Sequence, residues 1–226
     1  ARLFASAVEK NTTDTVQNIL KELPFPIIIK PVHLGSSIGI SITRTEIELE
    51  KKLIEASAVD GELLLEPFFS PISEYNCAVR RVNGKIETSP IEHPLSHDEI
   101  LSFADKYERA GKKTGAGMAS LSRELPAKIS GEFEAKIKDL AVRAFECTRM
   151  KGMVRIDFMV VPGDILYLTE INTIPGSMAY YLWESAGISY TQFNTELIEQ
   201  SVVDAAHTQR KQLEYHSDII ERFVQE

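Results

Sequence analysis

The chain has 226 residues, of which 43% are hydrophobic, and its formal net charge is −8 at pH 7. This length allows one large or two small domains with an apolar core. No basic stripe offsets the acidic balance and no apolar run reaches the roughly 20 residues of a membrane span, so we expect neither a nucleic-acid nor a membrane partner. The two cysteines, Cys77 and Cys147, lack the spacing of a metal site, which is typical of core thiols in a reducing, cytoplasmic compartment.

The first part of the chain alternates predicted helices and strands. Residues 13–23 place apolar side chains on one helical face, a proline ends that helix, and residues 25–30 indicate a short buried strand. Thr45 and Glu48 form a capping box, which predicts the start of a second helix. We expect the apolar stripe of that helix to contain Ile47, Leu53, Ile54 and Ala58.

A β-hairpin is predicted between 73–81 and 85–91, because the Asn83-Gly84 dipeptide that joins them is the strongest short hairpin signal. A buried strand at 62–69 precedes this hairpin. The order of strand, helix, strand and hairpin predicts an α+β or α/β layer architecture rather than a helix bundle.

A glycine loop at 33–40, H-L-G-S-S-I-G-I, follows the strand that ends at Lys30. Its backbone N–H groups and two hydroxyls can fold over phosphate oxygens, and Lys30 adds a cation. The segment is not a Walker A loop, because no Gly-Lys-Ser/Thr opens a helix here. An ordinary glycine-rich hairpin turn is the alternative interpretation.

A second hairpin is predicted by two β-branched runs, 153–161 and 165–171, on either side of a Pro-Gly-Asp turn. We expect a two-residue loop formed by Gly163 and Asp164. Directly opposed side chains on one face of such a pair lie about 5 Å apart.

This pairing brings four polar side chains together. Asp157 then faces Glu170, and Arg155 faces Asn172. Two carboxylates and an amide oxygen at that separation suit Mg²⁺, a hard cation that takes oxygen ligands. An arginine–carboxylate salt bridge at a strand end is the alternative interpretation.

Residues 92–125 lose their periodicity and contain several glycines and basic side chains, which is typical of either a functional lid or a disordered segment. Ser130 caps the helix that follows. Ser189 and Gln192 form a capping box that begins the last helix. We expect that helix to bury Phe193, Leu197, Ile198, Val202 and Ala205.

Four separated motifs occur in order along the chain: K-P-V-H-L-G-S-S-I-G-I from Lys30, K-Y at Lys106, R-I-D-F from Arg155 and E-I-N-T-I-P-G from Glu170. With L-W-E-S-A-G-I-S-Y from Leu182, they closely resemble the D-alanine–D-alanine ligase family of the ATP-grasp superfamily. The resemblance covers nearly the whole chain.

The resemblance implies an α+β, ATP-grasp fold. Its central subdomain, at 1–91, would carry the glycine-rich phosphate loop, and its C-terminal subdomain, at 92–226, the lid and the Mg²⁺ site. The residues that it assigns are Arg155, Ser36 and Tyr107 as catalytic; Lys30, Ser37, Glu66, Phe68, Phe69, Glu74, Lys106 and Met159 as ATP-binding; Asp157, Glu170 and Asn172 as metal ligands; and Gly176 with Ser177 at the second amino acid.

The implied reaction joins two D-alanines through an acyl phosphate, with ATP and Mg²⁺ or Mn²⁺, for peptidoglycan precursor synthesis in the cytoplasm. The loop between Gly176 and Leu182 is shorter than in the family, which leaves open D-serine, D-lactate or another second substrate. The family's N-terminal domain has no counterpart in this sequence, so we expect further residues upstream of Ala1. A non-catalytic nucleotide-binding fragment is the alternative from another class, and a homodimer of the full-length protein is also implied.

Overall fold

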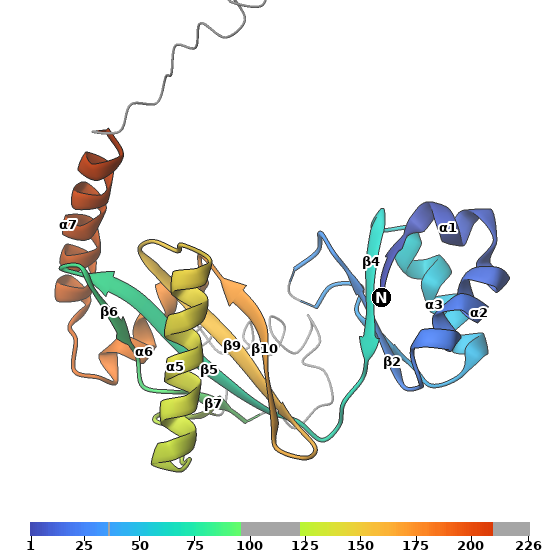
Figure 1. The fold of residues 1–226 in the computed structure, drawn as a ribbon, viewed down its shortest axis with the longest axis horizontal. Coiled ribbons are helices and arrows are strands. Elements are labelled where there is room, and N and C mark those ends of the chain that lie inside the picture. Colours follow the sequence, from blue (N-terminus) through green and yellow to red (C-terminus); the bar gives the residue numbers. More distant parts are fainter. Residues whose placement is uncertain (36, 96–122, 210–226) are drawn as a thin grey trace, which may run out of the picture. The chain divides into compact units, whose positions relative to one another are not determined.

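The computed structural model describes residues 1–35, 37–95 and 123–209 (Figure 1). The chain forms two compact units, each assembled from separate segments. The first comprises Ala1–Tyr75, His93–Glu124 and Phe158–Leu168, and the second comprises Asn76–Glu92, Leu125–Asp157 and Thr169–Glu226. The predicted subdomain boundary at residue 91 stays a prediction.

The first unit is built on a four-stranded antiparallel sheet of order β1-β4-β2-β3. Helices α1, α2 and α3 pack beside it, with α3 contacting three of its strands (Figure 1). Ile27 and Ile29 from β2 meet Leu63 and Leu65 from β4 in a fully buried core. The elements are β1 Arg2–Phe4, α1 Ala5–Lys10, α2 Thr12–Glu22, β2 Ile27–Pro31, β3 Ser41–Thr43, α3 Glu46–Ser57 and β4 Glu62–Pro67.

Helix α3 begins at the predicted capping box, since the Thr45 hydroxyl accepts a hydrogen bond from the Glu48 N–H. Its predicted apolar stripe is wrong in part. Leu49, Leu53 and Ala56 form the buried face, at the i, i+4, i+7 spacing of a helix, whereas Ile47 is 80% and Ile54 52% exposed. Ala58 follows the helix as its C-cap. Apolar residues lie on more than one side of this helix, and the side that packs against the sheet is the one with Leu49, Leu53 and Ala56.

A second sheet has the order β10-β9-β5-β6. Helix α5 packs against β6, and the Ser130 hydroxyl caps it as predicted by accepting from the Phe133 N–H. Residues from α6 and α7, with Trp183 and Phe193 fully buried, form a second core. The elements are β5 Ser73–Val82, β6 Lys85–Thr88, β7 His93–Pro94, β8 Arg123–Glu124, α5 Gly131–Cys147, β9 Met153–Val161, β10 Ile165–Asn172, η2 Gly176–Ala179, α6 Tyr180–Glu184 and α7 Tyr190–Gln209.

Both predicted hairpins form, but one connection differs. Asn83 and Gly84 have φ angles of 50° and 76° between the paired residues Val82 and Lys85, as a primed two-residue turn requires. The second hairpin has a three-residue connection, since β9 ends at Val161 and β10 begins at Ile165. Gly163 and Asp164, the two residues of the predicted loop, have φ angles of 89° and 58°, the positive values of a primed two-residue turn. The difference from the prediction is that β9 ends one residue earlier. A proline at the first loop position has no N–H for the strand ladder, which explains the extra residue.

Helix α7 begins as predicted, with the Ser189 hydroxyl accepting from the Gln192 N–H. Phe193 is fully buried and Leu197 packs against the same cluster. Ile198 and Val202, which the periodicity placed in the core, are 64% and 63% exposed, and Ala205 is exposed as well. The apolar residues that this helix buries therefore lie in its first turns, and farther along the polar Gln200 is buried, at 6% exposed.

A buried arginine connects the last helices to the second sheet. Arg80 of β5, 2% exposed, donates to Glu87 of β6 through Nε and Nη2. Its Nη2 also lies 2.9 Å from Glu196 of α7, an ion pair without hydrogen-bond geometry. The guanidinium carbon stands 4.5 Å from the ring centroid of Trp183. Arg80 therefore joins three elements by charge and by cation–π contact.

Within the described ranges, no helix is long and apolar enough to cross a membrane.

Candidate functional site

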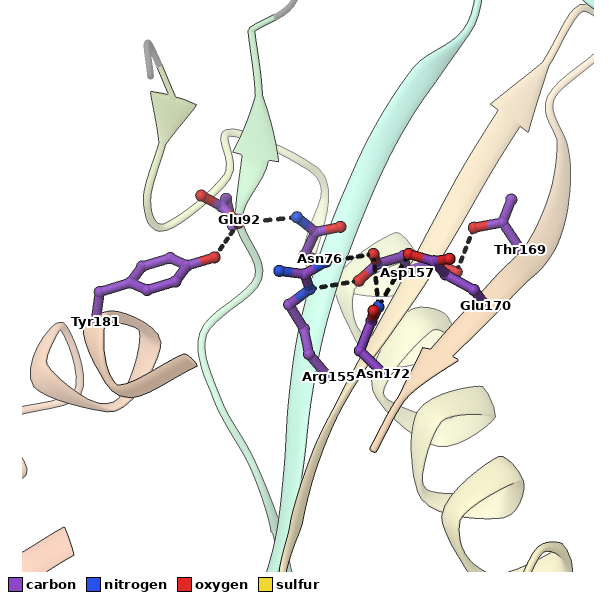
Figure 2. A network of polar contacts seen from close by, with 8 residues as sticks. All are labelled: Asn76, Glu92, Arg155, Asp157, Thr169, Glu170, Asn172 and Tyr181. Carbon is purple, nitrogen blue, oxygen red and sulfur yellow. Dashed lines mark hydrogen bonds and ion pairs between the residues drawn. The ribbon is translucent and has the colours of Figure 1, made fainter. Parts of the chain in front are cut away.

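The four polar side chains predicted to converge on the β9–β10 hairpin do lie together (Figure 2). Arg155 donates to both carboxylate oxygens of Asp157, through Nε and Nη2, each at 2.7 Å. The amide nitrogen of Asn172 donates to Asp157 at 3.0 Å and to Glu170 at 3.1 Å. The Thr169 hydroxyl donates to the Asp157 carbonyl at 2.9 Å and ties the two strands together. The cluster contains the salt bridge of the alternative interpretation, and a second carboxylate and an amide beside it.

Arg155 is largely buried, with 12% of its side chain exposed. Burial lowers its pKa, but the hydrogen bonds and charge of Asp157, with the further charge of Glu92, raise it above its ordinary value. The guanidinium is therefore a permanent cation. Nε and Nη2 serve Asp157, and no described side chain or carbonyl accepts from Nη1. Since guanidinium carries five N–H donors, this leaves donors for a bound molecule.

Asp157 is also largely buried, with 16% of its side chain exposed. Burial raises the pKa of Asp157 to about 6, because an ionised carboxylate loses its hydration there. The Arg155 guanidinium opposes this rise, and the neighbouring charge of Glu170 adds to it. A second cation nearby would therefore stabilise the ionised form of Asp157.

The donor set fits a divalent cation of the Mg²⁺ type. Asp157 and Glu170 supply carboxylate oxygens within reach of one amide, that of Asn172. Metal ligation would use the amide oxygen of Asn172, which rotation about its Cβ–Cγ bond exchanges with the nitrogen that now faces the carboxylates. The residues described hold no group of three or more His, Cys, Asp and Glu side chains suited to a metal. With two carboxylates and an amide, a phosphate-bearing ligand would complete the shell, as is usual for Mg²⁺.

A second network borders the cluster and was not predicted from the sequence (Figure 2). Glu92, 4% exposed, accepts hydrogen bonds on Oε2 from the Tyr181 hydroxyl at 2.6 Å and from the Asn76 amide at 2.9 Å. Asn76 and Glu92 also exchange two backbone hydrogen bonds. The only sequence signal for this network was a glutamate directly after the apolar end of an expected strand, at Ile91. That signal is weak, because most such glutamates are solvated.

Gly176 and Ser177, expected to hold the second amino acid, belong to a short η2 turn. Three successive residues there have left-handed backbone conformations, with φ of 50° at Ser177, 50° at Met178 and 47° at Ala179. Each costs a non-glycine residue about 1–2 kcal/mol. The turn leads directly into α6, the helix that carries Tyr181. A strained turn at this position is typical of a functional segment.

The first unit holds the residues expected to bind nucleotide. Lys30 forms an ion pair with Glu66, so the expected phosphate cation and the expected adenine-edge residue lie on paired strands β2 and β4. Phe69 stacks against Tyr167 with ring centroids 6.1 Å apart. Phe68 is partly buried, as is Phe69.

The other residues expected to bind ATP lie on several different segments of this unit. Glu74 is exposed, and its carbonyl lies 2.8 Å from Nδ1 of His93. Met159 is partly buried on β9. Ser37 has a φ of 61° in the glycine loop. Gly39 in the same loop has a φ of 74°, and a Cβ there would lie 2.8 Å from a side-chain carbon of Pro31, so the loop requires glycine at that position.

Three expected site residues, Ser36, Lys106 and Tyr107, lie outside the described residues, as do residues 108–122 of the expected lid.

Comparison with known proteins assigns the fold first. A structure of the D-alanine–D-alanine ligase from Coxiella burnetii superposes with a TM-score of 0.71 at 25% identity, covering 92% of this chain and 53% of that one. A structure of D-alanyl-alanine synthetase A from Vibrio cholerae superposes at 0.70 and 22% identity, covering 90% of this chain and 60% of that one. The α+β architecture is therefore that of an ATP-grasp fold, as predicted.

The sequence comparisons then assign the family. A model of the D-ala D-ala ligase C-terminus matches residues 2–199. The D-alanine–D-alanine ligase of Sulfurimonas denitrificans is 36% identical over 208 residues, covering 92% of this chain and 55% of that protein. The chain belongs to the D-alanine–D-alanine ligase family and spans about half the length of the curated relatives it matches.

Proposed function

We propose that this chain is the ATP- and metal-binding part of a ligase that joins two D-alanines, with ADP and phosphate as products. The observation that carries the proposal is the convergence of Arg155, Asp157, Glu170 and Asn172 on one hairpin. Membership of the D-alanine–D-alanine ligase family supplies the substrate class. The reaction serves peptidoglycan precursor synthesis in the cytoplasm, where ATP is available.

The chemistry requires charge neutralisation more than covalent help. A D-alanine carboxylate attacks the γ-phosphorus of ATP, ADP leaves, and an acyl phosphate forms; the amine of a second D-alanine then displaces phosphate from the acyl carbon. Mg²⁺, held by Asp157, Glu170 and Asn172, would supply positive charge to the ATP phosphates. Arg155 presents Nη1 to the oxyanion that develops at the acyl carbon, an interaction worth roughly 3–4 kcal/mol for a well-placed donor.

The first unit supports nucleotide binding through its own side chains. Lys30 forms an ion pair with Glu66 in the structure. With nucleotide bound, the Lys30 ammonium group would turn toward a phosphate. The Phe69 ring, already stacked with Tyr167, offers a flat apolar surface suited to a purine. The glycine loop adds the Ser37 hydroxyl, and we place Ser36, Lys106 and Tyr107 in the same reaction by family resemblance.

The second substrate is D-alanine in the leading proposal. The tight turn of Gly176 and Ser177 favours a related ligase with another acceptor as the second candidate, because three left-handed residues fix its backbone N–H groups in an unusual direction. Such a change in backbone direction alters which carboxylate or hydroxyl can be bound there.

The assay that separates these proposals measures ADP release and product mass with the intact protein, Mg²⁺-ATP and single or paired D-alanine, D-serine, D-lactate and L-alanine. A dipeptide product with D-alanine alone supports the leading proposal. A product only when a different acceptor is added supports the second candidate. Nucleotide binding without ADP release from any substrate contradicts both and leaves a non-catalytic nucleotide-binding module.

The metal site has a test of its own. Asp157→Asn removes one ligand charge, and we expect the affinity for Mg²⁺-ATP to fall by about 10–100-fold in calorimetry. Glu132→Gln, an exposed change on α5, is the matched control and should leave the affinity unchanged. Equal affinities for the two variants would contradict the metal site.

A further inference from the structure

The glycine loop, residues 33–40, leaves the first sheet between β2 and β3. The pairing of those two strands ends at Ile29 and Ser41, so the loop starts beyond that pair. On its other side β2 stays beside β4, and the Val32 N–H then donates to the Glu62 carbonyl at 3.0 Å. The loop therefore begins beside the first residue of β4.

Asp60 binds the first residue of this loop through both of its carboxylate oxygens. Oδ2 accepts the His33 backbone N–H at 2.7 Å, and Oδ1 lies 2.8 Å from Nδ1 of the His33 ring. Oδ1 also accepts the Glu62 N–H at 3.0 Å. The hydrogen bond from the His33 ring, followed by those from the two backbone groups, lowers the pKa of Asp60 to about 2. The carboxylate is therefore ionised at neutral pH and can only accept, so Nδ1 of His33 carries the proton.

Asp60 can hold a loop in place because it is itself fixed by neighbouring elements. It lies in the turn that joins α3 to β4 (Figure 1), with only 4% of its side chain exposed. Its backbone N–H donates to the Ala56 carbonyl at the end of α3, at 3.1 Å. The carbonyl of the next residue, Gly61, accepts the Ala5 N–H at the start of α1, at 2.9 Å. The turn is therefore attached to two helices and to β4.

The far end of the glycine loop returns to the same turn. A Cβ at Gly39 would lie 2.8 Å from a side-chain carbon of Pro31 and 3.8 Å from one of Val59, the residue before Asp60. Both ends of the loop thus lie against the α3–β4 turn. Because the ends of a short loop fix the path of the backbone between them, this turn sets the direction of the N–H groups that the loop presents.

We propose that Asp60 is a positioning residue, which holds the first residue of the glycine loop so that the backbone N–H groups of the loop stay directed toward the phosphates of a nucleotide. The proposal rests on the ligase function proposed above, in which this loop binds ATP. A loop that already has its bound shape loses less conformational freedom when the ligand arrives, and the affinity rises accordingly.

A purely local role for Asp60 is the alternative. A carboxylate that accepts the N–H two residues ahead forms an Asx turn, and such a turn needs only the bond from Glu62. Loss of Asp60 would then lower the melting temperature without a specific effect on phosphate binding. The two bonds from His33, which is 27 positions away in the sequence, favour the positioning role.

The test compares ATP with adenosine, because only ATP brings phosphates to the loop. The affinity of the intact protein is measured by calorimetry for Mg²⁺-ATP and by competition for adenosine. We expect Asp60→Ala to lower the affinity for Mg²⁺-ATP about 10-fold and that for adenosine by no more than about twofold. His33→Ala keeps the backbone bond to Asp60 and loses only the bond from the ring, so its affinity for Mg²⁺-ATP should fall about threefold.

Glu62→Gln is the matched control. Glu62 is a neighbouring carboxylate whose side chain pairs with Arg2 of β1 rather than with the loop, so this variant should leave both affinities unchanged. A ratio of ATP to adenosine affinity that stays at the wild-type value in both Asp60→Ala and His33→Ala overturns the positioning role, and His33→Ala alone decides if Asp60→Ala does not fold. A ratio that falls equally in Glu62→Gln also overturns it.

Failure of the proposed function gives a different result. A wild type that binds Mg²⁺-ATP no more tightly than adenosine contradicts phosphate binding by this protein, and the positioning role falls with it. A wild type that prefers Mg²⁺-ATP, with variants that keep this preference, contradicts the positioning role alone.

Discussion

Two arginines of the second unit, the buried Arg80 and the largely buried Arg155, differ in how they are surrounded. Arg80 lies between carboxylates from β6 and α7 and against the ring of Trp183, so its partners come from three elements. Arg155 takes its direct partner, Asp157, from its own strand two residues away. An arginine whose partners come from distant elements joins those elements together. An arginine paired with a neighbour on its own strand retains N–H donors that can bind a ligand. We therefore propose a stabilising role for Arg80 and a ligand-directed role for Arg155.

The largest effect should come from breaking the Arg80 contacts. Arg80→Met leaves Glu87 and Glu196 without their shared cation, and we expect about 3–5 kcal/mol of lost stability in urea unfolding. Arg81→Met is the matched control, because Arg81 is the next residue, donates to the Gly84 carbonyl and lies near the Phe145 ring. Its loss should be smaller, about 1 kcal/mol. Equal losses of stability for Arg80→Met and Arg81→Met would contradict the stabilising role of Arg80.

The second effect concerns activity. We expect Arg155→Met to lower kcat by about 10²–10³-fold, as for loss of an oxyanion donor, and to lower stability less than Arg80→Met does. Stability is affected less because Asp157, whose pKa is already about 6, can take up a proton when its partner is removed. Steady-state kinetics and urea unfolding of the same sample measure both. A folded Arg155→Met protein with full kcat would contradict the ligand-directed role.

The smallest effect extends the comparison to the surface, where His33, with a largely exposed side chain, lies 2.8 Å from Asp60. The hydrogen bond from His33 lowers the pKa of Asp60 to about 2, and the same bond raises the pKa of His33. The His33 contribution to stability is complete below its ordinary pKa of 6.5 and is lost as pH rises through the raised value. The Asp60 contribution is present above 3.8 and is lost as pH falls toward 2.

We therefore expect a small decrease in the melting temperature of the wild type between about pH 6 and pH 9, where His33 loses its proton. In His33→Gln this part of the decrease should be absent, because no charge is lost there. Melting curves at both pH values measure the difference. A larger decrease in His33→Gln than in the wild type would show that other groups dominate this range.

Much of the local structure was predictable because it depends on near neighbours. The Thr45, Ser130 and Ser189 caps each form the expected hydrogen bond to a residue three positions along. The convergence of Asp157 and Asn172 followed from a turn between two β-branched runs, although the connection is one residue longer than predicted. Their role as metal ligands stays a proposal.

The buried faces of two helices could not be predicted in the same way. Ile47 and Ile54 on α3, and Ile198 and Val202 on α7, are exposed despite their apolar spacing. Helical periodicity shows that apolar residues share a face, but the element packed beside the helix decides which face is buried.

The amino-acid sequence by itself determined the caps, the two hairpins and most of the helices and strands of this protein, and the set of polar residues on its second hairpin, because these depend on backbone preference and on residues within a few positions. Only the tertiary structure decided that Tyr181 reaches Glu92 across 89 positions of sequence. A hydrogen bond between distant residues leaves no local pattern, since it forms only once the packing of the core has brought its two elements together.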